Sequence, residues 1–206
     1  MRASEILNKA NHRDFEYPKR PWKFYQEWNK AIFLHWEIEP ELIKPLLPKS
    51  VELDTINNKA WVSLVAFDMN HIGIRNMPKI PHISDFHEIN IRTYIKCNGK
   101  SSVYFLSMEG SKRSSCKVLK AISKFPYEHS KMKRTDFSYE SHNSISNNSL
   151  ELIYRLQIEA TKKDATDIWL TERYAVFQDY KNKLIEYDVH HIEWPIQPIL
   201  IKNLEL

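Results

Sequence analysis

Four polar side chains on one predicted strand are the residues whose types and spacing best suit chemistry on a small molecule. Segment 83–109 predicts a β-hairpin, because Asn98-Gly99 suits a two-residue turn with positive φ at both positions. Side chains alternate between the two faces of a strand, so every second residue shares a face. The polar face of the first strand carries Glu88, Asn90, Arg92 and Tyr94. Such a row is more often a solvated face than a pocket lining, and the local pattern leaves both open.

Two further polar residues stand in apolar or aromatic surroundings. His35 lies inside the apolar segment 31–38, where a histidine is more often a hydrogen-bonded core residue than a catalytic one. Glu172 belongs to the cluster 171–174 and shares a face with Tyr174 if the segment is a strand. A salt link or helix cap between Glu172 and a neighbouring arginine would explain this cluster without any function.

The histidines give no metal-site motif. His82 and His87 flank Asp85, but no HxH, HExxH or Cys/His spacing accompanies them. His190 and His191 are adjacent, so regular strand geometry would point them to opposite faces. The chain has only three glycines, which excludes a Gly-rich phosphate loop. We therefore predict neither a metal nor a cofactor.

Composition narrows the class of protein further. The 206 residues, 42% of them hydrophobic, are enough for one sizeable core. The 30 basic and 26 acidic side chains give a net charge of +4 and are spread along the chain, which argues against a nucleic-acid partner. No apolar segment approaches the ~18 residues of a membrane helix, and the first residues lack the apolar stretch of a signal peptide. Cys97 and Cys116 are too few for a disulfide framework and are expected to be apolar fillers of a cytoplasmic protein.

Strand patterns dominate the chain and turn residues separate them. The predicted strands cover 31–38, 51–56, 59–69, both arms of 83–109, 133–142, 149–160, 173–180 and 183–194, and the predicted helices cover 3–11, 40–48 and 111–124. We expect a mainly β (α+β) fold, with a large antiparallel sheet, curved or closed, and a few peripheral helices. Residues 1–20 would form an N-terminal arm, and residues 21–206 a single domain.

Five segments together resemble a known family. The segments are FLHWEIEPELIKPLLPKSVELDT (33–55), AWVSLVAFDM (60–69), SDFHEINIRTYI (84–95), LTERYAVFQ (170–178) and HHIEWPIQP (190–198). They are similar to the uncharacterised YqjF-like family, a domain of unknown function in the acetoacetate decarboxylase-like superfamily. The resemblance implies a closed or nearly closed antiparallel β-barrel with a polar-lined cavity. It therefore favours a pocket over a solvated face for the polar row that begins at Glu88.

The same resemblance argues against one reaction. The decarboxylases attack a keto acid with a lysine that follows a Phe-Pro step, in a pattern like GFPKK. The similar step here reads Lys124-Phe125-Pro126-Tyr127-Glu128, so a tyrosine and a glutamate replace the lysine pair. Without the amine and its neighbouring cation, Schiff-base chemistry is not available at this position. We therefore expect a protein of this superfamily that is not a Schiff-base decarboxylase.

These observations lead to one main hypothesis. The protein would bind a small carboxylate or carbonyl compound, either as an enzyme or as a non-catalytic binding or sensor module. Arg92 would hold a carboxylate through its planar fork, and Glu88, similar to a pocket glutamate of the enzymes, would be the acid/base candidate. The other expected ligand-binding residues are Asn90, Tyr94, His35, Tyr127 and Glu172. A structural Glu88–Arg92 ion pair is the open alternative, and a homo-oligomer is also left open.

Overall fold

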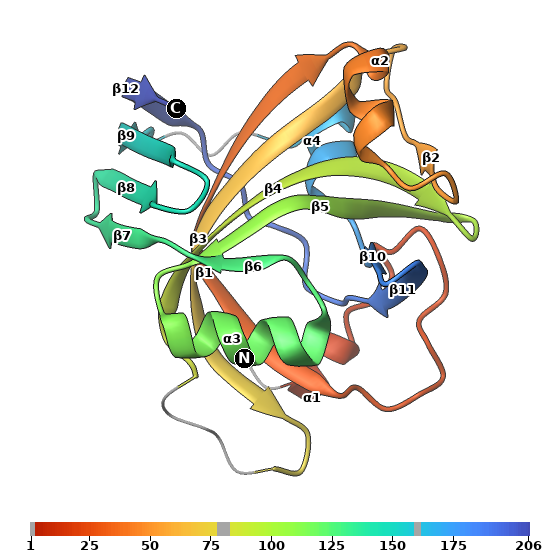
Figure 1. Ribbon diagram of the computed structural model, residues 1–206. Coiled ribbons are helices and arrows are strands. Elements are labelled where there is room, and N and C mark those ends of the chain that lie inside the picture. The colour runs from red at the N-terminus through yellow and green to blue at the C-terminus, as the bar shows by residue number, and fades with distance from the viewer. Residues whose placement is uncertain (1–2, 78–82, 159–161) are drawn as a thin grey trace.

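Strands account for most of this computed structural model, which describes residues 3–77, 83–158 and 162–206. In chain order the elements are α1 (Ala3–Leu7), β1 (Phe24–Ile38), α2 (Pro40–Ile43), the 3₁₀ turn η1 (Lys44–Leu46), β2 (Glu52–Leu53), β3 (Ala60–Ile74), β4 (Phe86–Cys97), β5 (Lys100–Gly110), α3 (Arg113–Ser123), β6 (Tyr127–His129), β7 (Lys131–Arg134), β8 (Ser138–Asn143), β9 (Asn148–Leu156), α4 (Ala165–Thr171), β10 (Ala175–Tyr180), β11 (Lys183–Asp188) and β12 (Ile199–Glu205). Figure 1 shows their arrangement.

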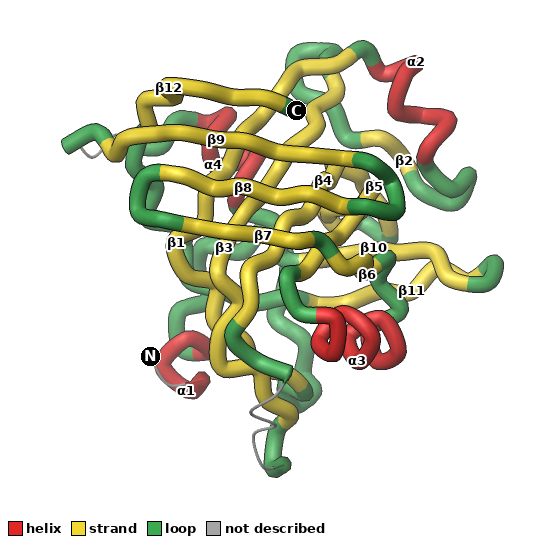
Figure 2. Tube along the Cα trace, turned by 60° about the vertical axis from the view of Figure 1, so that its left-hand side comes forward, coloured by secondary structure: helices red, strands yellow, loops and turns green. Residues whose placement is uncertain are grey.

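The larger sheet has the strand order β1-β3-β4-β5-β10-β11, and two short strands join it, β2 on β4 and β6 on β5. Its central pairs are antiparallel, whereas β5 pairs in parallel with both β10 and β6. The smaller sheet has the antiparallel order β12-β9-β8-β7 (Figure 2). The topology thus places β4, which carries the predicted polar row, in the middle of the larger sheet.

The two sheets pack through one apolar cluster. Side chains from β1, β3 and β4 meet those of β8 and β9, namely Ile32, Leu34, Leu64, Ala66, Ile89, Tyr139, Leu150, Leu152 and Tyr154. On β4 the apolar residue Ile89 points to the face opposite to that of the polar row, because side chains alternate along a strand. The smaller sheet therefore covers the face of the larger sheet that does not carry the polar row. Figure 1 shows α3 in front of the lower part of the larger sheet, and β6 leading from α3 to β7 of the smaller sheet.

The mainly β character and the few helices are as predicted, but the closed barrel is not confirmed. Within the described residues neither sheet pairs its first strand with its last, so each sheet stays open. The chain leaves the larger sheet after β6, forms β7, β8 and β9 of the smaller sheet, returns to the larger sheet with β10 and β11, and ends with β12 in the smaller sheet. An alternating pattern predicts each strand, but it does not say which strands pair, and closure depends on that pairing.

Local backbone requirements explain several element boundaries. Asn98 and Gly99 have φ values of 51° and 73°, as the predicted turn between β4 and β5 needs. Lys124 ends α3 in the left-handed conformation. At Gly110 an added Cβ would lie 2.8 Å from Cys116 Sγ, so only glycine lets α3 pack this closely on β5.

Other sequence predictions need correction. The predicted hairpin over 51–69 does not form, because β2 pairs with β4 and only an Ile56–Lys59 bridge closes the turn. The predicted last strand 183–194 ends at Asp188, so residues 189–194 are irregular. The predicted strand 133–142 is two strands, β7 and β8. The prediction also missed β6, β12 and α4, whose start carries a capping box at Asp164.

The described part of the N-terminal arm lies against the segment that follows β11. Arg13 Nη1 donates to the carbonyl oxygen of Val189 at 2.7 Å, and Arg20 forms an ion pair with Asp188. The His190 ring contacts the carbonyl oxygen of Ile6 at 2.9 Å. The arm therefore fastens residues 188–190 onto the body of the protein.

Candidate functional site

The predicted polar row lies on one face of β4, as expected from strand alternation. This face packs against α3, β6 and α4, because Tyr94 shares an apolar cluster with Cys116, Tyr127 and Leu170. We call the space between this face and those elements the interior. The four predicted residues are therefore not a solvated face: Glu88, Asn90 and Tyr94 are buried and Arg92 is partly buried.

Glu88 and Tyr127 form the most enclosed polar pair of the interior. Glu88 is only 1% exposed to solvent. The hydroxyl of Tyr127 donates a hydrogen bond to Glu88 Oε2 at 2.7 Å. Burial raises the pKa of Glu88 to about 8, while hydrogen bonds from Tyr127 and Asn90 act in the opposite direction. Burial likewise raises the pKa of Tyr127 well above its usual value. Glu88 is thus an acid that keeps its proton at neutral pH.

Arg92 lies four residues along the strand from Glu88 and has different partners. Its Nη2 donates to the carbonyl oxygen of Leu170 at 3.2 Å, and its guanidinium carbon lies 5.5 Å from the ring centre of Phe33. The Tyr94 hydroxyl donates to the same carbonyl oxygen at 2.9 Å. Among the described contacts the alternative Glu88–Arg92 ion pair does not occur.

His35 joins this group through a serine. Ser63 Oγ lies 2.6 Å from His35 Nδ1 and 2.6 Å from the Tyr94 hydroxyl, so three side chains form one hydrogen-bonded chain. Burial, and then the charge of Arg92, lower the pKa of His35 to about 4. His35 is therefore neutral at physiological pH, and the charge at this end of the interior belongs to Arg92.

Several buried polar atoms of the interior have no hydrogen-bond partner within the described protein. They are Trp28 Nε1, Trp61 Nε1, Asn90 Oδ1 and Arg92 Nε. Buried polar groups are nearly always paired, because an unpaired one costs about 1–3 kcal/mol. Both donors and an acceptor are available here, so the interior is suited to a small polar molecule.

Glu172 belongs to a separate network, away from the Glu88 end. Its carboxylate accepts from Lys163, from the hydroxyl of Tyr174 and from the backbone N–H of Trp194. Burial opposes the charge of Glu172, but these hydrogen bonds outweigh it and lower its pKa. The alternative of a salt link between Glu172 and a neighbouring arginine is wrong. Glu172 pairs with Lys163, and Arg173 pairs with the buried Asp54 at 2.7 Å.

Sequence reasoning missed the aromatic surroundings of Arg92. The ring of Trp194 lies 5.0 Å from that of Phe33, and the ring of His191 lies 5.4 Å from that of Trp194. Burial lowers the pKa of His191 to about 4, and the charge of Arg92 acts in the same direction. His191 was predicted on a strand, but it lies in the irregular segment after β11. Its only sequence signal was the HHIEW segment.

The nucleophile candidates of the interior are limited. Cys116 is buried, and burial raises the pKa of its thiol to about 11, which makes it the apolar filler that was predicted. Lys117 and Lys120 are on the exposed side of α3. At the position of the decarboxylases' second lysine, Glu128 accepts from the amide of Asn143 at 2.9 Å.

The described residues contain neither a metal-binding cluster nor a membrane-spanning helix. No group of three or more His, Cys, Asp and Glu side chains there is placed to hold a metal ion. His82, one of the loop histidines considered above, lies outside the described residues. Within the described part of the chain, no helix has the length and apolar character needed to cross a membrane.

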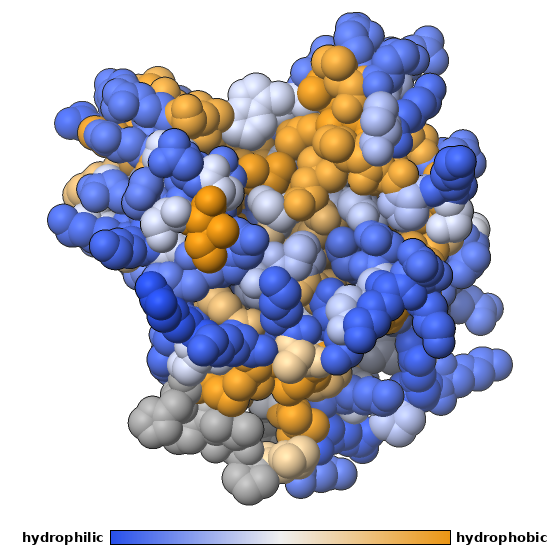
Figure 3. Space-filling model, viewed as in Figure 1, coloured by the Kyte–Doolittle hydropathy of each residue, from blue (hydrophilic) through white to orange (hydrophobic). Residues whose placement is uncertain are grey.

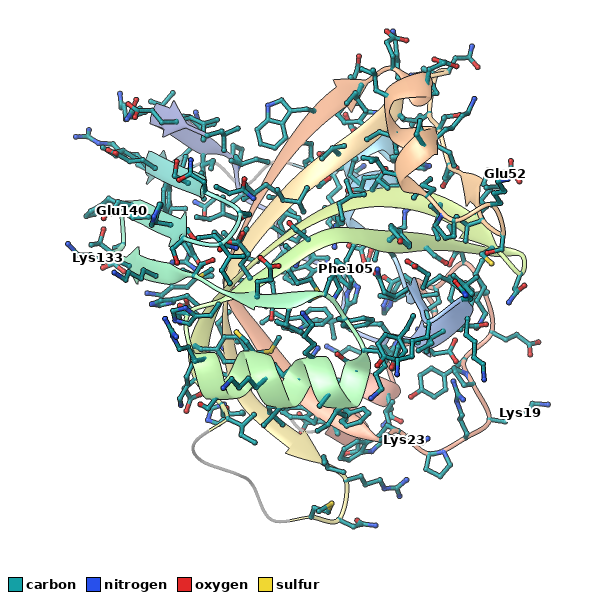
Figure 4. The ribbon with its side chains drawn as sticks, viewed as in Figure 1. Lys19, Lys23, Glu52, Phe105, Lys133 and Glu140 are labelled. Atoms are coloured by element: carbon teal, nitrogen blue, oxygen red, sulfur yellow. The ribbon has the colours of Figure 1, made fainter. Side chains whose placement is uncertain are left out.

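Two cavities lie outside the polar row. One of about 400 Å³ is open on the outer face of the smaller sheet, between residues such as Lys133 and Glu140, both labelled in Figure 4. The other, of about 230 Å³, lies beside β5 and includes Phe105. Neither cavity is lined by a residue of the polar row.

The fold is that of acetoacetate decarboxylase-like proteins. An acetoacetate decarboxylase structure matches with a TM-score of 0.58 at 11% identity, over 98% of this chain and 85% of that one. Acetoacetate decarboxylase from Legionella pneumophila subsp. pneumophila str. Philadelphia 1 matches with a TM-score of 0.53 at 15% identity, over 84% of this chain and 66% of that one. This chain thus spans just under two thirds of the Legionella protein. At these identities the likeness concerns the fold alone.

Sequence comparisons identify the family. Residues 25–206 match the DUF2071 family, described as an uncharacterized conserved protein. Over 200 residues the chain is 32% identical to the uncharacterized protein YqjF of Bacillus subtilis (strain 168), covering 93% of this chain and 82% of that protein. The chain therefore belongs to the DUF2071 or YqjF-like family. The family match begins after the N-terminal arm.

Proposed function

We propose that this protein binds a small carboxylate or carbonyl compound in the interior behind β4. The observation that carries the proposal is the pair of unpartnered buried atoms Arg92 Nε and Asn90 Oδ1, two residues apart on one face. Residues two apart on a strand lie about 6.8 Å from each other, a span that a compact acid can bridge when it also carries an O–H or N–H that donates to Asn90 Oδ1. The guanidinium would bind the carboxylate, and its planar fork favours two parallel hydrogen bonds.

Glu88 is the proposed acid/base group. With a pKa of about 8 it holds a proton at neutral pH and can donate it to a carbonyl oxygen. The hydrogen bond from Tyr127 fixes the carboxyl group, and Asn90 lies between it and the guanidinium of Arg92. His35, Tyr94 and the His191 ring would complete the Arg92 end as neutral hydrogen-bonding groups. Glu172 contributes indirectly, through Trp194 and the segment that carries His191.

The fold likeness supports the class of ligand and no more. Acetoacetate decarboxylase, by its name, acts on a small keto acid, and a related interior suits an acid of that size. The Schiff-base reaction is not proposed here, because Tyr127 and Glu128 stand at the lysine positions. With a ligand bound, we propose that the interior becomes the polar-lined cavity expected of this superfamily. A cytoplasmic location, the absence of nucleic-acid and membrane partners, and an oligomeric assembly stay predictions.

A non-catalytic binding or sensor module is the second candidate. The near-complete enclosure of Glu88 by Tyr127 and its neighbours favours it, because a catalytic acid must reach its substrate. A module of this kind would keep the Arg92 end for binding and use Glu88 as a structural acid. The two candidates differ only in whether the bound molecule is changed.

A thermal-shift screen of small carboxylates and carbonyl compounds tests the binding proposal. Wild type is compared with Arg92→Ala and with the control Arg155→Ala, because Arg155 is exposed on β9. A ligand at a hundred times its Kd stabilises the native state by about 2.7 kcal/mol. We expect hits that Arg155→Ala keeps and Arg92→Ala loses. Hits indifferent to Arg92→Ala, or no hits with well-folded protein, would contradict the proposal.

Turnover then separates the two candidates. Each hit is incubated with wild type and with Glu88→Gln, and product formation is followed by NMR. Product that forms with wild type and not with Glu88→Gln identifies an enzyme that uses this acid. Binding by both proteins without any product identifies the non-catalytic module.

A further inference from the structure

The larger sheet has a break along one edge of β5. Among the described strands, β10 pairs with β5 only at Val103, and β6 pairs with it from Met108 onward. Residues 104–107 lie between these two parallel neighbours without a strand partner on that edge. A register shift at the same place bends β5 against β4. The sheet therefore has a gap between β10 and β6.

The side chain of Gln178 fills the backbone gap. Its Oε1 accepts from the N–H of Phe105 at 3.3 Å, and its Nε2 donates to the carbonyl oxygen of Phe105 at 3.4 Å. The side-chain amide of Gln178 thus makes two long hydrogen bonds in place of those that the backbone of a neighbouring strand would make to Phe105. Phe105 and Gln178 are both buried, so without these two hydrogen bonds the backbone N–H and C=O of Phe105 would lack partners on this edge.

A small pocket lies at this gap. Its volume is about 230 Å³, and its lining is Leu46, Tyr104, Phe105, Leu106, Pro126 and Gln178. Leu46 forms the exposed rim, with 56% of its surface open to solvent. In Figure 3 apolar side chains gather on the upper right, over the region that α2 and β5 occupy in Figure 1. The pocket is apolar except for the Gln178 amide and the Tyr104 hydroxyl.

The pocket adjoins the interior through Phe105. This residue lies directly opposite Arg92 in the β4–β5 register and packs in the same apolar cluster as Tyr127. Figure 4 labels Phe105 near the place where β5 passes β6. Pro126, which also lines the pocket, immediately precedes Tyr127, whose hydroxyl donates to Glu88. Two residues of the pocket lining, Phe105 and Pro126, are therefore immediate neighbours of residues in the proposed binding site.

We infer that this pocket is the subsite for an apolar tail on the ligand, with its carboxylate at Arg92 and with Phe105 as the gate between the two. This inference rests on the proposed function and narrows its ligand to carboxylates with a short apolar chain. A cavity of about 150 Å³ is large enough for benzene, so 230 Å³ accommodates four to six carbons. Gln178 supports the gate through its two long hydrogen bonds to the backbone of Phe105.

Binding of acetate, butyrate and hexanoate, measured by calorimetry, tests the subsite. Burial of each methylene contributes about 0.8 kcal/mol, so affinity is expected to rise about fourfold per methylene in wild type. Leu46→Trp fills the mouth of the pocket and should abolish this gain while acetate affinity stays unchanged. Leu42→Trp is the matched control, because Leu42 is exposed on the neighbouring α2 and does not line the pocket. Both variants change exposed residues, so folding should be retained.

The outcomes separate the subsite from the proposed function. The subsite is overturned, and the proposed function stands, in either of two cases. In the first, binding depends on Arg92 but affinity does not change with chain length; in the second, the rise in affinity with chain length persists in Leu46→Trp. A length effect that Leu46→Trp removes, in binding that Arg92→Ala does not weaken, supports the pocket and overturns the role of Arg92. No binding at any chain length overturns both.

Discussion

The Tyr127 hydroxyl donates a 2.7 Å hydrogen bond to Oε2 of Glu88 in the most enclosed part of the interior. Tyr127 stands where the resemblance to the decarboxylases places a lysine, so this chain has a phenol and a buried acid there in place of an amine. A phenol–carboxyl pair can orient and move a proton, but it cannot form a Schiff base. The likeness to the decarboxylases therefore does not extend to Schiff-base chemistry at Tyr127.

Glu88→Gln is expected to change how stability depends on pH. The pKa of Glu88 is about 8 in the folded protein and near 4.5 when unfolded, so the folded state binds more protons between these values. The free energy of unfolding therefore falls as pH rises through this window, by up to about 1.4 kcal/mol per pH unit. Gln cannot ionise and should remove this contribution.

Urea unfolding at pH 5, 6.5 and 8 measures the difference. The free energy of unfolding of Glu88→Gln, relative to wild type, should rise steadily from pH 5 to pH 8. Glu140→Gln is the control, because Glu140 is exposed on β8 and should leave the pH dependence unchanged. A constant difference between Glu88→Gln and wild type would show that Glu88 titrates normally.

Tyr127→Phe removes the donor and keeps the ring. At pH 6 the loss of one hydrogen bond to a neutral carboxyl group should cost about 1 kcal/mol of unfolding free energy. The hydrogen bond from Tyr127 favours the charged form of Glu88, so its loss raises the pKa of Glu88 further. The cost of the substitution should therefore grow between pH 6 and pH 9 in the same urea measurements. An equal cost at both pH values would contradict this coupling.

Arg92→Ala should raise the pKa of His35. Burial and the charge of Arg92 together hold that pKa at about 4, and the substitution removes the charge and opens the surroundings. NMR titration of the imidazole protons should show the His35 pKa moving toward its ordinary value of 6.5. The pKa of His129, which burial and the charge of Arg113 lower, should not change. An unchanged His35 pKa would place Arg92 too far away to act on it.

Local sequence rules predicted the part of the site that β4 carries. Alternation along one strand and an Asn98-Gly99 turn depend on neighbouring residues only, so the face shared by Glu88 and Arg92 could be predicted. The Phe-Pro step also pointed to Tyr127, through a family resemblance. These features needed no knowledge of which strands pair.

The surroundings of that face could not be predicted in the same way. His191 and Trp194 approach Arg92 only because the chain leaves the sheet after β11, and no local pattern encodes that path. The pairing of β2 with β4 likewise depends on tertiary packing, although 51–69 has the pattern of a hairpin. Closure of the sheet was expected from the resemblance, and the observed strand order leaves both sheets open.

Asp54→Ala should be strongly destabilising, because it leaves a buried cation without its partner. Arg173 and Asp54 lie 2.7 Å apart, and their side chains are 3% and 1% exposed. Loss of one member of a buried pair typically costs about 3–5 kcal/mol. Lys96→Ala is the control, since Lys96 contacts the same carboxylate with a side chain that is 54% exposed, and an exposed pair contributes at most about 1 kcal/mol. Equal losses of unfolding free energy in Asp54→Ala and Lys96→Ala, measured by urea unfolding, would contradict the stronger contribution expected of the buried Asp54–Arg173 pair.

Arg13→Ala should loosen the segment that presents His191 to the interior. Arg13 is the main fastening of the N-terminal arm: it donates to the carbonyl oxygen of Val189 at 2.7 Å, and its guanidinium carbon lies 4.9 Å from the Tyr174 ring centre. Loss of these contacts should lower the local opening free energy around residues 189–194 more than the global free energy of unfolding. Hydrogen–deuterium exchange should therefore be faster in this segment and unchanged in β4.

Arg20→Ala is the matched control for the arm. Arg20 pairs with Asp188 in the same region, but its side chain is 62% exposed, so its contribution should be small. Exchange at residues 189–194 should stay near the wild-type rate in Arg20→Ala and rise in Arg13→Ala. If both variants exchange alike, Arg13 does not fasten this segment. If the faster exchange spreads into β4, the arm stabilises the whole interior and not only the segment that carries His191.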